Sequence, residues 1–389
     1  MMDRSKAAVV LKAVALVAAV IGLSMFFTRH WGGKMEKPRA PKEIVIRYDM
    51  TVNEFGRENG LNMEMLEKAL GFKELKDYGK KISDLPLSEQ EIVTRTKKTL
   101  AMSEEFGTKN WVKIPVKIGL WLVMMAAAFR LLRKGAVTSS RRKWLYLASI
   151  SVFGVVLGNE PSPMNTLTDT IALLGAKGII FPPRMVMLLV FLAITVLANK
   201  LICGWGCQFG TLQDLLFRLN RDSDGKSVIS QRKVPFAVTN TLRAAVFALF
   251  TALALGWSMD IISPVNPFKI YNPLMVTSLG AAVLAVIVFA SLFVYRPWCH
   301  AACPFGFIGW LAEKASVFKV RVNYTTCIAC EKCSKACPST AMEAILKQDR
   351  TAPDCFSCAT CVEVCPTGSV SFSKGKRDLP PQGKFTQGS

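Results

Sequence analysis

Twelve cysteines carry the reactive chemistry of this sequence, and every one falls in a short-spaced group at or after position 203. Two groups, 203–207 and 299–303, each read Cys-x-x-x-Cys followed by x-Phe-Gly, and each comes after a long apolar run. The other eight cysteines form two copies of Cys-x2-Cys-x2-Cys-x3-Cys-Pro, at 327–338 and 355–366. Scattered cysteines would suggest secreted disulfides, whereas these spacings indicate metal–thiolate ligation.

The two longer motifs match the signature of bacterial two-cluster ferredoxins, in which the fourth cysteine of each motif ligates the other cluster. Iron needs soft thiolate ligands, and four must converge on each cubane. The spacing therefore predicts one [4Fe–4S] cluster on Cys327, Cys330, Cys333 and Cys365, and a second on Cys355, Cys358, Cys361 and Cys337. A zinc site or disulfides are the alternatives, and two complete copies 28 residues apart disfavour both.

The two shorter groups repeat the second half of a ferredoxin motif. Together they supply four thiolates, the number that one further cluster needs. If their hairpins are related by a twofold axis, a third cluster or another metal could lie between them. A thiol–disulfide relay and simple packing of buried thiols remain alternatives. The residues concerned are Cys203, Cys207, Cys299 and Cys303.

Three kinds of residue flank these pairs. His300 is expected to contact a ligand or lie at the membrane interface rather than bind the metal itself. Lys200, Arg296 and Trp298 are expected to anchor helix ends at that interface. The two cations would also offset the negative charge of a thiolate-ligated cluster.

Apolar runs place these motifs in a membrane protein. About 20 apolar residues span a bilayer, and such runs occur at 7–27, 113–132, 144–158, 185–202, 241–259 and 274–295. The first run lacks a small-x-small cleavage site and is interpreted as an uncleaved anchor. The sequence thus predicts six transmembrane helices.

Basic residues orient these helices. The chain carries 49 Lys and Arg against 28 Asp and Glu, a net charge of +21. The excess gathers at 130–143 and 208–240, which the positive-inside rule assigns to the cytoplasm. It follows that the N-terminus, both cysteine pairs and the ferredoxin segment are cytoplasmic, and that residues 31–112 are extracytoplasmic. The excess charge is then a topology signal, so no nucleic-acid partner is expected.

The outer segment is predicted to be a small helical adaptor. Residues 50–72 show helical spacing with a break at Gly60, a pattern also compatible with a DNA-binding helix-turn-helix. Four glutamates between positions 54 and 67 would repel phosphate. The adaptor interpretation is therefore favoured.

The fold class follows from these segments: a mainly α, polytopic helical bundle with a C-terminal α+β ferredoxin domain. Strands are expected at 318–323 and 369–372 and a helix at 339–346. The predicted division is a membrane anchor at 1–30, a helical outer domain at 31–112, a membrane core at 113–306, a two-cluster ferredoxin domain at 307–375 and a disordered tail at 376–389. The core contains an internal repeat, because its outer loops EPSPMN (160–165) and SPVNP (263–267) also match.

The helix ends CGWGCQFGTLQD (203–214) and CHAACPFG (299–306), followed by two ferredoxin motifs, resemble the NapH/NosR/CcoG-type membrane polyferredoxins. The resemblance is strongest to NapH-like quinol dehydrogenase membrane components and covers about 113–375. It implies iron–sulfur electron transfer between the quinone pool, or a membrane partner, and another redox protein. Gln208 departs from the family, which usually has Pro after the second cysteine.

Three functions compete at this point. The first is an electron-transfer subunit of a quinol-dehydrogenase-type oxidoreductase, within a hetero-complex in a bacterial or archaeal cytoplasmic membrane. The second is a maturation or regulatory iron–sulfur protein for a respiratory reductase. The third is a subunit of a ferredoxin-linked ion pump, which would need acids inside its helices. The apolar runs contain almost none.

Overall fold

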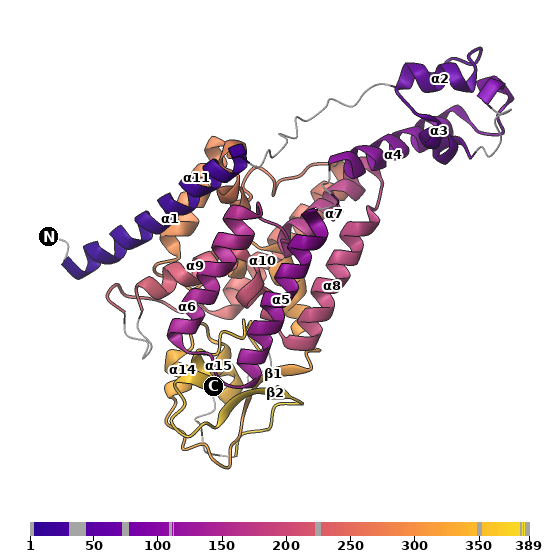
Figure 1. Ribbon diagram of the computed structural model, residues 1–389. Coiled ribbons are helices and arrows are strands. Elements are labelled where there is room, and N and C mark those ends of the chain that lie inside the picture. Colours follow the sequence, from indigo (N-terminus) through magenta and orange to yellow (C-terminus); the bar gives the residue numbers. More distant parts are fainter. Residues whose placement is uncertain are drawn as a thin grey trace.

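The computed structural model describes residues 4–30, 44–71, 78–108, 111, 113–221, 227–347, 352–381, 383 and 385. Parts of the predicted outer segment and of the predicted tail lie outside the described residues. Figure 1 shows a helical core with the ferredoxin segment at one end and a small helical unit beyond the other.

The outer unit consists of α2 (Val52–Asn59) and α3 (Met63–Leu70), which pack against the start of α4 (Glu89–Thr108). Thr51 and Glu54 form a reciprocal capping box that fixes the start of α2. The predicted break is present, because Gly60 ends α2 in a left-handed conformation with φ of 68°. The two short helices enclose a small apolar core of their own, separate from the main one.

The main core contains five apolar helices at the positions of predicted spans. Within the described residues, three of them are long and apolar enough to cross a membrane: α1 (Arg4–His30), α5 (Lys113–Arg133) and α10 (Phe236–Trp257). Two are shorter: α8 (Pro182–Ala198) and α11 (Ser278–Ala290). The run at 144–158 forms α6 (Ser139–Ala148) and the π-helical η3 (Ser149–Val156).

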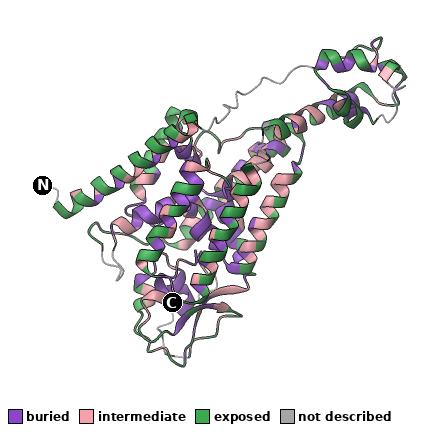
Figure 2. Ribbon diagram, viewed as in Figure 1, coloured by how far each residue is buried: buried purple, intermediate pink, exposed green. Residues whose placement is uncertain are grey.

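The outward faces of these helices carry large apolar side chains. Figure 2 shows exposed residues along the outer sides of the helices and buried residues between them. Exposed apolar residues recur along each helix, as with Leu11, Val123, Leu189, Leu249 and Val286. A water-soluble surface rarely presents so much contiguous apolar area, so these faces suit contact with lipid.

The two matching outer loops meet each other inside the core. Asn266 donates a hydrogen bond of 3.0 Å from its Nδ2 to Oδ1 of Asn165. Gln208 donates from its Nε2 to the Pro161 carbonyl at 3.1 Å, and its own carbonyl accepts from the Tyr271 hydroxyl at 2.9 Å. Gln208, the departure from the family pattern, thus joins both loops to the segment after Cys207.

Short helices carry the chain through the rest of the core. Those that come before α11 in the chain are α7 (Pro163–Lys177), η4 (Ile202–Gly206), α9 (Gln208–Leu219), η5 (Pro267–Tyr271) and η6 (Pro273–Met275). A second set follows α11: α12 (Pro297–Ala301) and α13 (Pro304–Glu313). A further 3₁₀ turn, η2 (Ile82–Asp84), belongs to the outer unit.

The ferredoxin segment is built on one antiparallel strand pair. β1 (Phe318–Val322) pairs with β2 (Val370–Lys374), with Val320 opposite Phe372. These strands occupy the predicted positions, and α15 (Ala341–Lys347) occupies the position of the predicted helix. Two shorter helices complete the unit: α14 (Lys332–Ala336) and α16 (Thr360–Glu363). Phe129 of α5 packs edge-on against Phe318 and Phe372, which fixes the sheet to the membrane core.

Part of the predicted tail contacts this unit. Arg377 donates from its Nε to the Val320 carbonyl at 3.1 Å. Asp378 pairs with Arg321 at 3.0 Å, and the Phe385 ring lies against Tyr324. These residues lie against β1 and its end, whereas residues 382, 384 and 386–389 lie outside the described residues.

Candidate iron–sulfur sites

The two ferredoxin motifs fold into matching loops. In each loop, the residue before the second cysteine and the residue after it have positive φ: Ala329 and Glu331 in the first, Ser357 and Ala359 in the second, at 50° to 60°. Non-glycine residues seldom adopt this conformation, and it clusters at functional sites. Left-handed residues inside such loops turn successive N–H groups toward one concavity, the kind of nest that binds anions and iron–sulfur clusters.

The first predicted ligand set comes together in space. The thiol of Cys333 interacts electrostatically with those of Cys365, Cys327 and Cys330. Cys365 comes from the other motif, so the structure places the predicted crossing cysteine beside Cys333. Burial raises the pKa of Cys333 to about 11, so ligation by iron would have to deprotonate this thiol.

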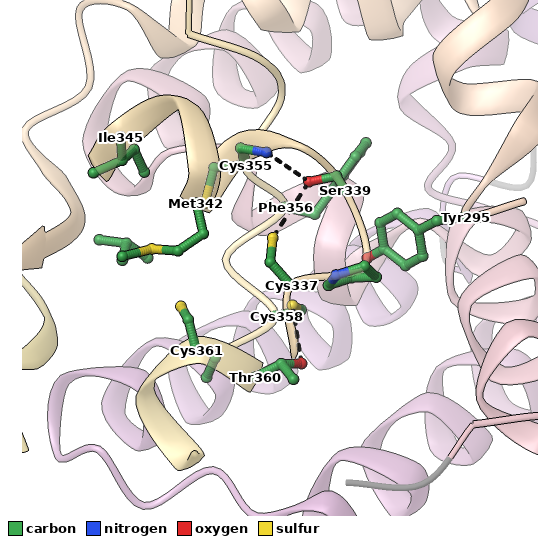
Figure 3. A pocket seen from close by; sticks show the side chains of 14 residues that line it. Tyr295, Cys337, Ser339, Met342, Ile345, Cys355, Phe356, Cys358, Thr360 and Cys361 are labelled. Carbon is green, nitrogen blue, oxygen red and sulfur yellow. Dashed lines mark hydrogen bonds between the residues drawn. The ribbon is translucent and has the colours of Figure 1, made fainter. Parts of the chain in front are cut away.

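The second predicted ligand set lines a cavity. Its walls include Cys337, Cys355, Cys358 and Cys361 (Figure 3), together with Tyr295 from the membrane core. The thiol of Cys361 interacts electrostatically with those of the other three and with that of Cys333 in the first set. The two sites are therefore neighbours, as a conduit for single electrons requires.

Hydroxyl groups lie beside three of these sulfurs. Each hydroxyl residue comes two positions after its cysteine: Thr360 Oγ1 is 3.3 Å from Cys358 Sγ, Ser339 Oγ is 3.6 Å from Cys337 Sγ, and Thr367 Oγ1 is 3.7 Å from Cys365 Sγ. Hydrogen bonds to cluster sulfurs are among the ways a protein sets reduction potential. This Cys-x-Ser/Thr pattern is a signal in the sequence that spacing of the cysteines alone does not reveal.

Arginines support the second site from outside. Burial raises the pKa of Cys358, but the guanidinium groups of Arg218 and Arg142 outweigh burial and hold that pKa below its ordinary value. Arg142 donates to the Cys358 carbonyl at 2.8 Å and pairs with Glu363 at 2.9 Å. Both arginines come from helices of the membrane core, α6 and α9.

The two membrane pairs also converge on each other. The thiol of Cys207 interacts electrostatically with those of Cys299, Cys203 and Cys303. All twelve cysteines of the chain are free. In the described part of the chain, no three His, Cys, Asp or Glu side chains are arranged to hold a single metal ion. A four-iron cluster places each of its four thiolates on a different iron.

The Phe-Gly that follows each pair has a structural reason. A Cβ on Gly306 would lie 2.7 Å from the Cys299 carbonyl oxygen, and one on Gly210 would lie 3.0 Å from that of Cys203. Without a side chain, the Gly306 N–H approaches the Cys303 sulfur and donates to it at 3.3 Å. The glycine thus lets the backbone close around the sulfur.

The second cysteine of each pair is also the N-cap of a helix. Cys207 precedes α9, and Cys303 precedes α13. Unpaired N–H groups and the helix dipole favour negative charge at this position, and helix N-termini promote thiolate formation. The repeat therefore places the second thiol of each pair at the start of a helix.

Lys200 and Arg296 do not anchor helix ends at an interface, so that expectation was wrong. Both side chains are fully buried, and each stands three residues before the first cysteine of its pair. Lys200 donates to the Gly306 carbonyl at 2.8 Å and to Asp354. Arg296 donates to the carbonyls of Cys203 and Gly204 and pairs with Asp214 at 2.8 Å. Each cation therefore reaches across to the other pair.

Trp298 and His300 are also inside the core. Trp298 is buried, and its indole N–H points at the Met164 sulfur at 3.3 Å, so the expected interfacial anchor is absent here too. His300 is half-buried. Its Nδ1 lies 3.1 Å from the Arg296 carbonyl, and its ring lies beside those of Tyr295 and Phe356. This histidine therefore contacts residues around the sites, namely Arg296, Tyr295 and Phe356.

The membrane pair and the second ferredoxin loop are in direct contact. A Cβ on Gly204 would collide with the Phe356 carbonyl, so the two cysteine loops pack backbone to backbone. Trp205 donates from its indole to the Ser357 carbonyl at 3.1 Å, and the Arg296 guanidinium lies 4.7 Å from the Phe356 ring centre. Sequence spacing alone did not reveal this contact.

The first pair lies beside the middle of α5 rather than at its end. Trp121 donates to the Gly206 carbonyl at 3.0 Å, and Met125 also borders Gly206. Phe129, nearer the C-terminal end of the same helix, contacts the ferredoxin sheet. The Pro161 loop contacts Gln208, directly after Cys207, and the ferredoxin loop contacts Gly204, so the first pair is enclosed from both sides.

A mainly helical chain with apolar helices and a C-terminal ferredoxin unit defines a membrane-associated iron–sulfur electron-transfer protein. Comparison with known families agrees. Residues 320–372 match a 4Fe-4S dicluster domain, and residues 180–234 and 277–323 match a 4Fe-4S binding domain. The second match contains both membrane pairs.

Relatives narrow the class. YccM of Escherichia coli is 32% identical over 176 residues, which cover 43% of this chain and 49% of YccM. The regulatory protein NosR of Pseudomonas aeruginosa is 26% identical over 64% of this chain and 37% of NosR. The ferredoxin-type protein NapH of Haemophilus influenzae is 25% identical over 50% of this chain and 63% of NapH. These findings support the NapH/NosR-type polyferredoxin family, and the predicted resemblance is confirmed.

The matches span less than two thirds of each of these relatives. No solved structure matches the chain significantly.

Proposed function

We propose that the chain relays electrons between the quinone pool, or a membrane partner, and another redox protein through three [4Fe–4S] clusters. Two clusters occupy the ferredoxin ligand sets, and the third occupies Cys203, Cys207, Cys299 and Cys303. The observation that carries this proposal is the direct contact between the membrane cysteine loop at Gly204 and the ferredoxin loop at Phe356. Such a contact gives electrons a short path from the membrane core to the ferredoxin unit.

Buried charge supports clusters at both contacting loops, the membrane pairs and the second ferredoxin site. Five cationic side chains, each at least nine-tenths buried, surround the two contacting loops: Arg142, Lys200, Arg218, Arg243 and Arg296. Their carboxylate partners are three: Asp214, Asp354 and Glu363. An excess of two buried positive charges is costly without a counter-charge. Thiolate-ligated clusters would supply negative charge at this place.

The nearby carboxyl groups do not neutralise the two excess positive charges. Burial raises the pKa of Asp354, but Lys200 and Arg243 outweigh burial and hold that pKa at about 2, so this carboxylate is already counted as ionised. Burial raises the pKa of Glu313 to about 8, so this carboxyl is mostly neutral at pH 7.

Topology and partners complete the proposal. The N-terminus and the ferredoxin unit face the cytoplasm, the outer unit at 31–112 faces away from it, and six helices cross a bacterial or archaeal cytoplasmic membrane. The basic segments at 130–143 and 208–240 support this orientation. A relay needs a source and a sink, so the chain works with other redox subunits.

Iron and sulfide content test the proposal on the full chain, purified anaerobically. Three cubanes require about twelve irons per chain and the ferredoxin pair alone about eight. Twelve irons per chain would support the complete proposal, and eight would exclude the third cluster. Fewer than eight would overturn the two-cluster claim as well.

A second candidate function is the maturation or regulation of a respiratory reductase, which similarity to the regulatory protein NosR favours. Deletion of the gene distinguishes the electron relay from the maturation or regulatory function. Loss of electron flow to a metal-replete reductase supports the relay. Retained flow in the membranes together with a metal-deficient reductase supports maturation.

A further inference from the structure

The first ferredoxin site is the most exposed of the three cysteine sets. Cys330 is exposed, and the other three cysteines of this set are half-buried. In the second ferredoxin set two cysteines are buried and none is exposed, and in the membrane set three of the four are buried. Exposure of the cysteines thus increases from the membrane pairs to the first ferredoxin site, so an electron that passes along the sites reaches the protein surface there.

The surface beside the exposed cysteine is apolar and uncharged at its centre. Ile328, two residues before Cys330, is 64% exposed. Thr326 in the same loop lies 2.8 Å from Ser369, hydroxyl to hydroxyl, which brings the exposed residues 366–368 to this loop. Protein interfaces have an apolar centre and a polar rim, and this surface has the features of such a centre.

Cations gather around α14, the helix next along the chain. Lys332 and Lys335 are exposed on the helix itself, and neither forms an ion pair within the part of the chain that the structure describes. From the membrane core, Arg221 donates to the Lys335 carbonyl and Lys233 donates to the Ser334 carbonyl, both at 2.9 Å. Four positive charges are thereby brought to one short helix beside the first site.

The acids near this helix leave a positive excess. Glu331 is exposed at the start of α14, and Glu343 on the neighbouring α15 pairs with Lys347 at 2.9 Å. A surface with an excess of one sign raises the rate of encounter with a partner of the opposite sign and orients that partner. An anionic membrane would also attract these cations, but a lipid surface cannot accept the electron that an exposed cluster delivers.

We infer that this surface, formed by the loop 326–330, residues 366–368 and the cations around α14, docks an acidic one-electron carrier protein. The inference rests on the proposed function and adds where the redox partner binds and which charge it carries. One electron leaves the reduced first cluster, which becomes oxidised, and reduces the carrier by one electron; no bond or proton changes place. The reverse transfer uses the same surface. Encounters of this kind need only a small contact, below about 1,200 Å².

Stopped-flow mixing of the full chain with carriers of opposite charge tests this surface. The acidic probe is a plant-type [2Fe–2S] ferredoxin, mixed in the direction that the reduction potentials allow, and the basic probe is oxidised mitochondrial cytochrome c, mixed with the reduced chain. At low ionic strength, Lys332→Glu/Lys335→Glu should slow exchange with the ferredoxin about tenfold and should speed reduction of cytochrome c. Added salt should bring the rates of variant and wild type together.

A matched control reverses the same number of charges elsewhere on the ferredoxin unit. Lys374 and Lys376 are exposed at the end of β2. Figure 1 shows β2 and α14 on different sides of the unit. Lys374→Glu/Lys376→Glu should therefore change either rate less than about twofold, because a charge beyond the Debye length of about 10 Å is largely screened at 0.1 M salt.

Iron content and the extent of reduction by dithionite are measured on every variant, so that loss of a cluster is separated from loss of docking. Iron-replete variants in which the α14 pair behaves like the β2 pair would overturn this surface and leave the relay intact. Iron-replete wild-type protein that exchanges no electrons with the acidic ferredoxin in either direction would overturn the acidic carrier. A chain without clusters would overturn the proposed relay itself.

Discussion

Gly210 and Gly306 show how single residues prepare the membrane site. Gly306 donates its backbone N–H to the Cys303 sulfur at 3.3 Å, and both glycines lack the Cβ that would press on the carbonyl of the first cysteine of the pair. The motif Cys-x-x-x-Cys-x-Phe-Gly is therefore a backbone requirement as well as a ligand set. Its repetition gives both halves of the site the same local geometry.

Gly306→Ala should disturb the membrane site without unfolding the chain. The added Cβ would lie 2.7 Å from the Cys299 carbonyl, so the loop must shift, at a cost of about 1–3 kcal/mol. We expect the iron count to fall toward that of the ferredoxin pair alone. Gly256→Ala in α10 meets no atom within 4 Å and serves as the control. An unchanged count in Gly306→Ala would contradict the proposed role of this backbone.

Replacing Cys203 and Cys299 together by Ser tests the ligand set directly. Loss of one cubane should lower the iron content by about four per chain and leave the dithionite-reduced signals of the ferredoxin clusters in place. Cys327→Ser should instead remove iron from the ferredoxin unit. If the double variant keeps all its iron, the four membrane cysteines do not bind a cluster, and a thiol–disulfide relay or simple packing explains them instead.

The ligand sets could be predicted from the sequence, but their surroundings could not. Ferredoxin spacing is local, so Cys327, Cys330 and Cys333 follow from three positions in one loop. The buried cations depend on distant partners, since Asp354 lies 154 positions after Lys200 and Arg296 lies 82 after Asp214. A cation near a helix end is usually an interfacial anchor. The sequence does carry one signal of their role: a cation stands three residues before the first cysteine in both halves of the repeat.

At the scale of elements, α6 and α9 hold the ferredoxin loop from the membrane side. Arg142 of α6 reaches the Cys358 carbonyl and Glu363, and Arg218 of α9 reaches the Thr360 hydroxyl at 3.2 Å. The run at 144–158 was predicted as a simple span. Its helix begins earlier, at Ser139, and the added turn carries Arg142, so the hydropathy pattern missed the residues that connect the two units.

Arg142→Ala should lower the reduction potential of the second ferredoxin cluster. Removing a positive charge beside Cys358 favours the oxidised, less negative cluster. A unit charge several Å away contributes about 1–3 kcal/mol at an effective dielectric near 20, which corresponds to roughly 40–130 mV for a one-electron couple. Potentiometric titration followed by electron paramagnetic resonance measures the shift. Arg141→Ala, at an exposed neighbouring position, should leave the potential in place. Equal potentials in both variants would exclude an electrostatic role for Arg142.

At the scale of the whole molecule, the proposed topology places the source and sink of electrons on one side. The outer unit joins the core through α4, whose Glu104 pairs with Lys177 at 3.3 Å and whose Glu105 pairs with Arg184 at 3.0 Å. The ferredoxin unit contacts α5 at Phe129, toward the end of that helix that lies away from α4. Figure 1 shows these two units at opposite ends of the core. A membrane between them would separate any partner of the outer unit from the ferredoxin clusters.

Reporter fusions test this arrangement. Alkaline phosphatase, which is active only outside the cytoplasm, should be active when fused after Gly79 in the outer unit and inactive when fused after Lys376 beyond β2. Green fluorescent protein fused at Lys376 should fluoresce. The physical reason is the density of Lys and Arg at 130–143 and 208–240, which under the positive-inside rule favours a cytoplasmic position for these segments. Phosphatase activity at both positions would place the ferredoxin unit on the far side of the membrane, where its electrons could not reach a cytoplasmic partner.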